Sequence, residues 1–352
     1  MIRIRGCLST AVFGLLLGCT LSWARPDSNE KQPLRLYVGN SMGSNVSVID
    51  LGSLKVVDDL TVGRHVHCVA LTADGRRLFT TSELDHTLVT SDTATNKIIG
   101  TVKLPGKPNE CAVTPDARYV TVPIRDGNSV VIVDANQQKI VKTLPIREPH
   151  NSVNIGSNRY TFVSSMGSHE IVVIDFEKLD FSAHIPVGGR PRPFVVSKDG
   201  RTLYVAVSDL HGFNIVDVPT QKVLQRVAMP SEHPAPPRLR AYETPDTYTH
   251  GLALTADETQ LWVTSLLDDC IYIYDLKVKK VVGRLDTGDG PNWVVFSPDG
   301  KYGCVSSTDS DDVSIFDVKQ RREVARVKVG KAPKRIAIAI APAASRGQVA
   351  KR

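Results

Sequence analysis

The chain has 352 residues, of which 41% are hydrophobic and 23% are charged. This balance excludes a disordered, tail-like chain and a membrane protein with many spanning helices. The formal net charge is +6, but several basic residues stand near the chain ends, namely Arg3, Arg5, Arg346, Lys351 and Arg352. Because the central part is close to neutral, the composition gives no sign of nucleic-acid binding.

Residues 1–24 are typical of an export signal peptide. Arg3 and Arg5 form a basic start, residues 8–17 form an apolar run, and residues 22–24 (Ser-Trp-Ala) match a small-x-small cleavage site. We therefore expect the mature protein to be periplasmic or secreted.

A lipid anchor at Cys19 is the alternative to a free form. Residues 16–19 (LLGC) resemble a bacterial lipobox, although the Leu before the Gly is a poor fit to the small residue usual there. We interpret residues 25–33 as a linker and residues 342–352, which are rich in small residues, as a disordered tail.

Four cysteines remain outside the signal peptide, and none has C-x-x-C spacing. In an exported protein, this favours buried strand residues or a disulfide over a metal site. These cysteines are Cys68, Cys111, Cys270 and Cys304.

An aspartate that closes a short apolar run recurs seven times, with spacings of 42, 42, 41, 42, 58 and 42 residues. Each period contains four short runs rich in Val, Ile, Leu and Tyr, separated by turn residues that include Asp-Gly pairs. The pattern predicts an all-β fold, a seven-bladed β-propeller with four-stranded antiparallel blades. We expect the aspartates to accept hydrogen bonds within their own turns. They are Asp50, Asp92, Asp134, Asp175, Asp217, Asp275 and Asp317.

The two ends of the repeat region predict how the ring closes. The chain enters at Leu36-Tyr-Val38 with a second strand, and it ends at Arg335–Ile340 with a lone first strand. These strands can share one blade, which leaves no unpaired inner edge. We therefore expect residues 34–341 to form a single propeller domain.

The repeats resemble the YVTN-type β-propeller repeat of exported bacterial and archaeal proteins. The resemblance rests on Leu203-Tyr-Val-Ala-Val, Phe213-Asn-Ile-Val-Asp217, Val187-Gly188 with Pro193, and Ser197-Lys-Asp-Gly200. It implies the propeller fold but not one function, because this architecture hosts surface proteins, lactonases, a lyase and redox components. More distant similarity extends to the propellers of haem-d-type nitrite reductase, its haem-biosynthesis protein, the methylamine dehydrogenase heavy chain and nitrous oxide reductase.

A polar residue opens each innermost strand when the repeats are aligned. These positions are expected to ring one mouth of the central channel, where they bind a ligand or, alternatively, only link neighbouring blades. Arg192 and Lys334 suit a carboxylate or phosphate, and the three histidines are candidate ligands for a transition metal or haem. The ring comprises His67, Asn109, His150, Arg192, His250, Asn292 and Lys334.

Residues 229–249 form a proline-rich insertion in the fifth spacing, just before His250. Such a segment can arch over or beside the channel mouth, or it can be a surface loop without a role. Its candidate contact residues are Arg238, Arg240, Tyr242 and Tyr248.

The favoured hypothesis is an exported monomeric scaffold that binds a small ligand or a protein partner at the histidine-bearing face. Hydrolase, zinc-peptidase and nucleotide-binding signatures are absent from the sequence, so we expect no chemistry of its own and no nucleic-acid partner. The first alternative is a metal- or haem-associated accessory of a periplasmic redox system. The second is a lactonase- or lyase-type enzyme, in which an acidic residue such as Glu110 pairs with a ring histidine.

Overall fold

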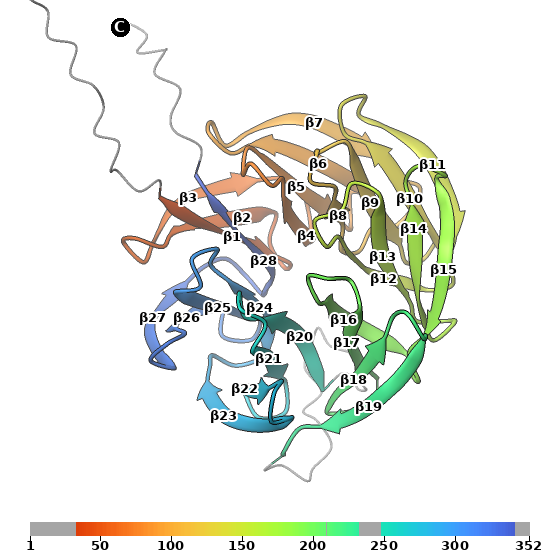
Figure 1. The fold of residues 1–352 in the computed structure, drawn as a ribbon. Helices are drawn as coiled ribbons and strands as arrows, with labels where there is room; N and C mark the ends of the chain where they lie inside the picture. Colours follow the sequence, from red (N-terminus) through yellow and green to blue (C-terminus); the bar gives the residue numbers. More distant parts are fainter. Residues whose placement is uncertain (1–32, 209, 232–247, 342–352) are drawn as a thin grey trace, which may run out of the picture. The chain divides into compact units, whose positions relative to one another are not determined.

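Seven four-stranded antiparallel sheets are arranged as blades around a common centre, which confirms the predicted seven-bladed propeller (Figure 1). The structure is a computed structural model that describes residues 33–208, 210–231 and 248–341. The predicted signal peptide, nearly all of the linker, residues 232–247 of the insertion and the tail lie outside the described residues. Within the described residues, no helix is long and apolar enough to cross a membrane.

Each blade contributes one strand to each of four concentric positions. The innermost strands are β4 (Val66–Leu71), β8 (Ala112–Val113), β12 (Pro149–Val153), β16 (Pro191–Val196), β20 (Thr249–Leu254), β24 (Pro291–Phe296) and β28 (Pro333–Ile340). The second strands are β1 (Leu34–Asn40), β5 (Arg77–Ser82), β9 (Tyr119–Ile124), β13 (Tyr160–Ser165), β17 (Thr202–Val207), β21 (Gln260–Ser265) and β25 (Tyr302–Ser307). The third strands are β2 (Asn45–Asp50), β6 (Thr87–Asp92), β10 (Ser129–Asp134), β14 (Glu170–Asp175), β18 (Gly212–Asp217), β22 (Cys270–Asp275) and β26 (Asp312–Asp317). The outermost strands are β3 (Lys55–Thr61), β7 (Lys97–Lys103), β11 (Lys139–Pro145), β15 (Asp180–Pro186), β19 (Lys222–Ala228), β23 (Lys280–Asp286) and β27 (Arg322–Lys328).

The ring closes as predicted, through one blade built from both ends of the chain. Strand β28 pairs antiparallel with β1, with Leu36 opposite Ile338 and Val38 opposite Ile336. In Figure 1 the blue β28 lies beside the red-orange β1. The pairing satisfies the backbone hydrogen-bonding groups of β1, whose edge would otherwise be an exposed template for strand pairing.

The hydrophobic core lies between neighbouring blades. One cluster joins Phe79 and Leu88 of one blade to Val120, Val122 and Val131 of the next. Third strands such as β10 and β14 are therefore buried on both faces, and their sequences are nearly continuous apolar runs. The outermost strand β15 instead alternates between exposed and less exposed residues, because its outer edge faces solvent.

The seven recurring aspartates act in turns, as predicted. Each accepts a hydrogen bond from a backbone N–H two or three residues later, for example Ser53 to Asp50 at 2.7 Å and Gln320 to Asp317 at 2.7 Å. These turns connect the third strand of a blade to its outermost strand. They lie at the end of the ring opposite to the predicted histidine-bearing mouth, so the aspartates are not part of that site.

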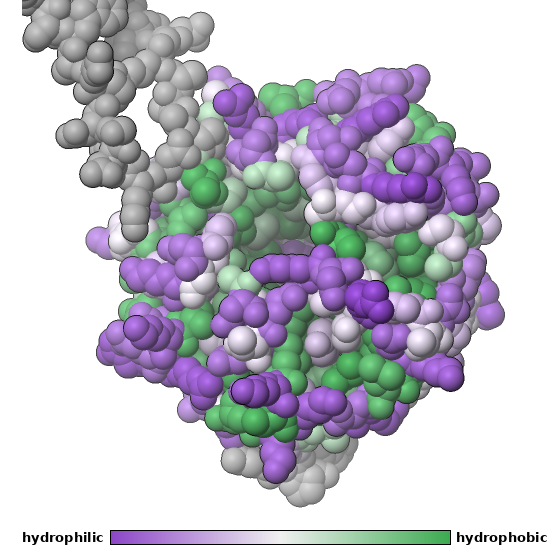
Figure 2. Space-filling model, viewed as in Figure 1, coloured by the Kyte–Doolittle hydropathy of each residue, from purple (hydrophilic) through white to green (hydrophobic). Residues whose placement is uncertain are grey.

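The centre of the ring is hollowed. In the space-filling view of Figure 2, hydrophobic surface is visible inside the central hollow among hydrophilic side chains. The innermost strands form the wall of this channel. The residues at their starts determine which polar groups line one of its mouths.

Candidate ligand-binding channel

The predicted ring residues stand at or next to the starts of the innermost strands. Six of them lie within β4, β12, β16, β20, β24 and β28, but Asn109 precedes the short strand β8, which begins only at Ala112. Six of the seven are buried, and Lys334 is partly exposed. The structure therefore places these polar groups on the channel wall and not on the outer surface.

Two of the ring histidines meet although they are far apart in the sequence. The rings of His150 and His250 contact each other edge to face, with centroids 6.5 Å apart. They belong to blades separated by one further blade, so this contact requires convergence toward the channel axis. His250 Nδ1 lies 3.1 Å from the carbonyl oxygen of Asn292, and His150 Nδ1 contacts the side chain of Asn151.

The third histidine, His67, lacks such a partner. Its Nδ1 atom is buried and makes no hydrogen bond. The ring stacks on His65 with centroids 6.2 Å apart, and His65 Nε2 lies 3.3 Å from a carboxylate oxygen of Glu83. A buried polar atom without a partner is costly, so His67 is the ring residue best suited to bind a ligand.

All three histidines are held neutral near pH 7. Burial lowers the pKa of His67, His150 and His250 well below the ordinary value of 6.5. The positive charge of Arg335 lowers the pKa of each further, and Arg192 contributes strongly to the pKa shift at His150. Neutral imidazole is the form that ligates a metal ion.

His67 and Asn109 line a cavity of about 350 Å³ at this mouth, called here the histidine cavity. Its size lies within the range of small-molecule sites. The remaining lining residues come from the loops between blades and from the turns between second and third strands. They are Glu83, Lys107, Pro108, Arg125, Asp126, Glu148, Met166 and Arg190.

The candidate metal ligands His67, His150 and His250 are not gathered into one group of potential metal ligands. In the described parts of the chain, no three or more His, Cys, Asp and Glu side chains are grouped so as to hold a metal ion. His150 and His250 use their Nδ1 atoms within the channel wall. Any metal at this mouth would therefore have to bring further ligands of its own.

The sequence interpretation missed the polar group that closes the channel. Arg335 Nε lies 2.9 Å from the Glu110 carboxylate, and Arg335 Nη1 donates to Asn292 Oδ1 at 3.2 Å. The guanidinium also lies over the indole of Trp293, 3.9 Å from the ring centroid. Asn151 donates to the same Glu110 oxygen.

Glu110 therefore pairs with arginine and not with a ring histidine, contrary to the suggested acid and base pair. Burial raises its pKa, while Arg335 opposes that shift. We call Glu110, Asn151, Trp293 and Arg335 the closing layer. These four residues each follow a ring residue by one position, which is the signal that could have identified them.

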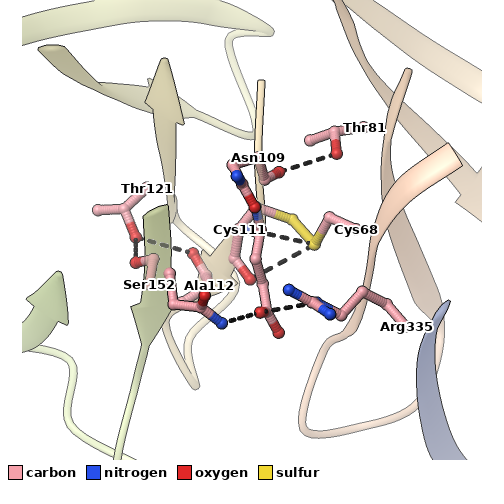
Figure 3. Close-up of a disulfide and its surroundings, with 10 residues drawn as sticks. Cys68, Thr81, Asn109, Cys111, Ala112, Thr121, Ser152 and Arg335 are labelled. Carbon is pink, nitrogen blue, oxygen red and sulfur yellow. Dashed lines mark hydrogen bonds and ion pairs between the residues drawn. A yellow bond between two sulfur atoms is a disulfide. The ribbon is translucent and has the colours of Figure 1, made fainter. Parts of the chain in front are cut away.

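A disulfide joins two blades next to this layer. Cys68 and Cys111 are bonded, with their Cα atoms 5.9 Å apart, and Figure 3 shows Arg335 beside them. Cys270 and Cys304 are free and buried. The cysteines are thus a bridge and buried strand residues, as predicted.

Of the four candidate contact residues of the insertion, the structure describes Tyr248. Arg238, Arg240 and Tyr242 lie outside the described residues. Tyr248 is partly buried just before β20, and its carbonyl accepts the backbone N–H of Leu266 at 2.9 Å. No contact to the histidine cavity is recorded for Tyr248.

Comparisons with known proteins place the chain in a family. NirF of Stutzerimonas stutzeri is 23% identical over 287 residues, which cover 74% of this chain and 69% of that protein. Among solved structures, dihydro-heme d1 dehydrogenase NirN in complex with DHE has a TM-score of 0.63 at 18% identity, covering 86% of this chain and 74% of that chain. The periplasmic gluconolactonase PpgL of Pseudomonas aeruginosa has a TM-score of 0.69 at 20% identity, covering 88% of this chain and 100% of that chain. Residues 120–351 match the family model described as the cytochrome D1 heme domain, and the chain belongs to this family.

Proposed function

We propose that the chain binds an iron tetrapyrrole of the haem class at the histidine cavity, with His67 as the protein ligand to iron. The observation that carries this proposal is His67, whose side chain belongs to the lining of a cavity of about 350 Å³ and whose buried Nδ1 atom makes no hydrogen bond to the described residues. The family match and the heme d1 protein NirN among the structural neighbours support this ligand class.

The residues at this mouth fit such a group. His67 is neutral, as an iron ligand must be, because burial and the charge of Arg335 lower its pKa. The charged groups that lower the pKa of His150 and His250 include Arg192, Lys334 and Arg335, so the layer below the cavity lies in a positive field. Tetrapyrroles carry carboxylate side chains, which such a field attracts.

The bound group would supply iron chemistry, or would be carried as cargo to another protein. This chain's own residues would hold the iron through His67, attract the carboxylates, and exclude water beneath the cavity through the closing layer. The gluconolactonase PpgL is only 20% identical to this chain, so that likeness concerns the fold alone. Delivery to a protein partner stays a prediction.

The test is titration of the purified full-length chain with ferric haem, followed by absorption spectroscopy. We expect one equivalent to bind with an imidazole-ligand spectrum, and we expect His67→Ala to weaken binding at least tenfold. The matched control is His184→Ala, because His184 lies in the outermost strand β15 with its side chain 55% exposed. Equal binding by the wild type and His67→Ala, or no stoichiometric binding by the wild type, would overturn the proposal.

We also propose export to the periplasm. The predicted signal peptide and the disulfide between Cys68 and Cys111 support it, because disulfides persist in oxidising compartments. Cell fractionation and mass determination of the mature protein distinguish the free form from one lipidated at Cys19. A protein that keeps residues 1–24 and stays in the cytoplasm contradicts export.

A further inference from the structure

A second and larger cavity occupies the opposite end of the channel. Its volume is about 670 Å³, and we call it the far cavity. It is lined by the later residues of the innermost strands and by the turns that follow them, including Asn154, Lys198 and Ser297. No described residue lines both cavities, and the closing layer lies between them.

The walls of the far cavity are made apolar by a second ring of residues. Three positions after the polar ring, every blade carries Ala or Val. Six of these residues are paired with the third residue of their second strand, as Ala253 is with Trp262, and Ala337 is paired with Tyr37, the fourth residue of β1. The ring comprises Ala70, Ala112, Val153, Val195, Ala253, Val295 and Ala337, of which all but Ala70 and Ala337 line the cavity.

Small side chains at this position leave space that larger ones would fill. Protein interiors otherwise pack without such voids, so a hollow lined by small apolar groups on successive blades is a specific feature. Phe194, Trp293 and Phe296 add aromatic surface to its lining. An apolar ligand readily displaces water from a cavity with apolar walls. Binding then removes the apolar surfaces of both the ligand and the cavity from water, which is favourable.

The charges at the far cavity nearly cancel, which favours an uncharged ligand over a charged one. Its lining contains three charged residues, Glu110, Lys198 and Glu258. Glu110 is paired with Arg335 at 2.9 Å, and the other two residues carry opposite charges, with Glu258 accepting the backbone N–H of Lys198 at 2.7 Å and the Lys198 ammonium donating to the carbonyl of Ala256. Because the cavity carries little net charge, its attraction for an ion would not offset the free-energy cost of removing that ion from water.

We propose that the far cavity binds an uncharged, largely apolar small molecule that contains an aromatic ring. Stacking on Trp293 and the two phenylalanines would orient the ring, since aromatic pairs prefer offset or edge-to-face contact. This site is separate from the proposed haem site, and its occupancy does not depend on His67.

The test uses the uncharged fluorescent probe N-phenyl-1-naphthylamine with the full-length protein. We expect one equivalent to bind saturably, with energy transfer to the probe from Trp293 in the lining and from Trp262, which packs on Phe296. Ala253→Leu is expected to weaken binding at least tenfold because the larger side chain occupies the cavity. The matched control is Ala337→Leu, which places the same side chain at the equivalent ring position outside the cavity.

Val195→Phe is a second blocking variant, so the result does not depend on the folding of one protein. Trp293→Phe should retain probe binding within a few-fold and keep the energy transfer that comes from Trp262, which packs on Phe296 of the cavity lining with ring centroids 4.9 Å apart. His67→Ala should bind the probe like the wild type while losing haem, which separates failure of this proposal from failure of the first. Equal binding by the Ala253→Leu and Ala337→Leu variants, or the absence of saturable binding to the wild type, would overturn it.

Discussion

The buried pair His150 and His250 predicts that the protein loses stability in mildly acidic solution. Both side chains are almost fully buried, at 5% and 7% exposure, and both have a pKa well below 6.5 in the folded state. The unfolded chain therefore binds more protons than the folded chain once the pH falls below about 6.5. The free energy of unfolding must decrease as the pH decreases through this range.

The magnitude follows from proton linkage. A histidine that stays neutral in the folded protein and titrates at about 6.5 in the unfolded chain costs about 1.4 kcal/mol between about pH 7.5 and about pH 5.5. The pair His150 and His250 together cost about 3 kcal/mol. With an unfolding entropy of about 2.1 cal/mol/K per residue, such a loss lowers the melting temperature of a domain of this size by roughly 5 °C.

The assay is denaturant unfolding at a series of pH values, with the protein free of haem. The double variant His150→Gln/His250→Gln should lose about 3 kcal/mol less than the wild type over this range, because glutamine does not titrate. The control His184→Gln removes an exposed histidine and should keep the wild-type pH dependence. A double variant that follows the wild-type curve would show that these imidazoles are not the buried neutral groups described above.

Three further variants test other parts of the fold. Arg335→Met should destabilise the protein by about 3–5 kcal/mol by leaving Glu110 buried without its cation, and the double variant Glu110→Gln/Arg335→Met should recover most of this loss in denaturant unfolding. Cys68→Ser/Cys111→Ser opens a loop with a sequence separation of 43 and should cost about 4 kcal/mol in the same measurement, and a reductant should then have no further effect. Asp92→Ala removes the side chain that accepts the Thr95 backbone N–H at 2.8 Å, and should lower stability by about 1 kcal/mol in thermal melts with no change in haem binding.

The sequence repeat predicted both the fold and the closure of the ring because each repeat encodes the strands and turns of one blade. Strands of alternating direction and turn aspartates such as Asp50 depend on near neighbours in the sequence, and the pairing of β28 with β1 repeats the first-to-second-strand pairing of the other blades. The polar residues that open the innermost strands could be aligned for the same reason. Arg335 was not recognised because its partners, Glu110 and Asn292, belong to other blades.

By itself, the sequence determined that seven equivalent blades would present polar residues at one mouth of a channel. Only the tertiary structure decided which of these residues contact each other, since that depends on distances across the axis between blades far apart in the chain. It paired His150 with His250, left His67 Nδ1 without a partner, and joined Arg335 to Glu110. The same packing divided the channel into the histidine cavity, which has a charged and polar lining, and the far cavity, which has a mainly apolar lining. Small side chains in the second ring leave the space of the far cavity, and the closing layer separates it from the histidines.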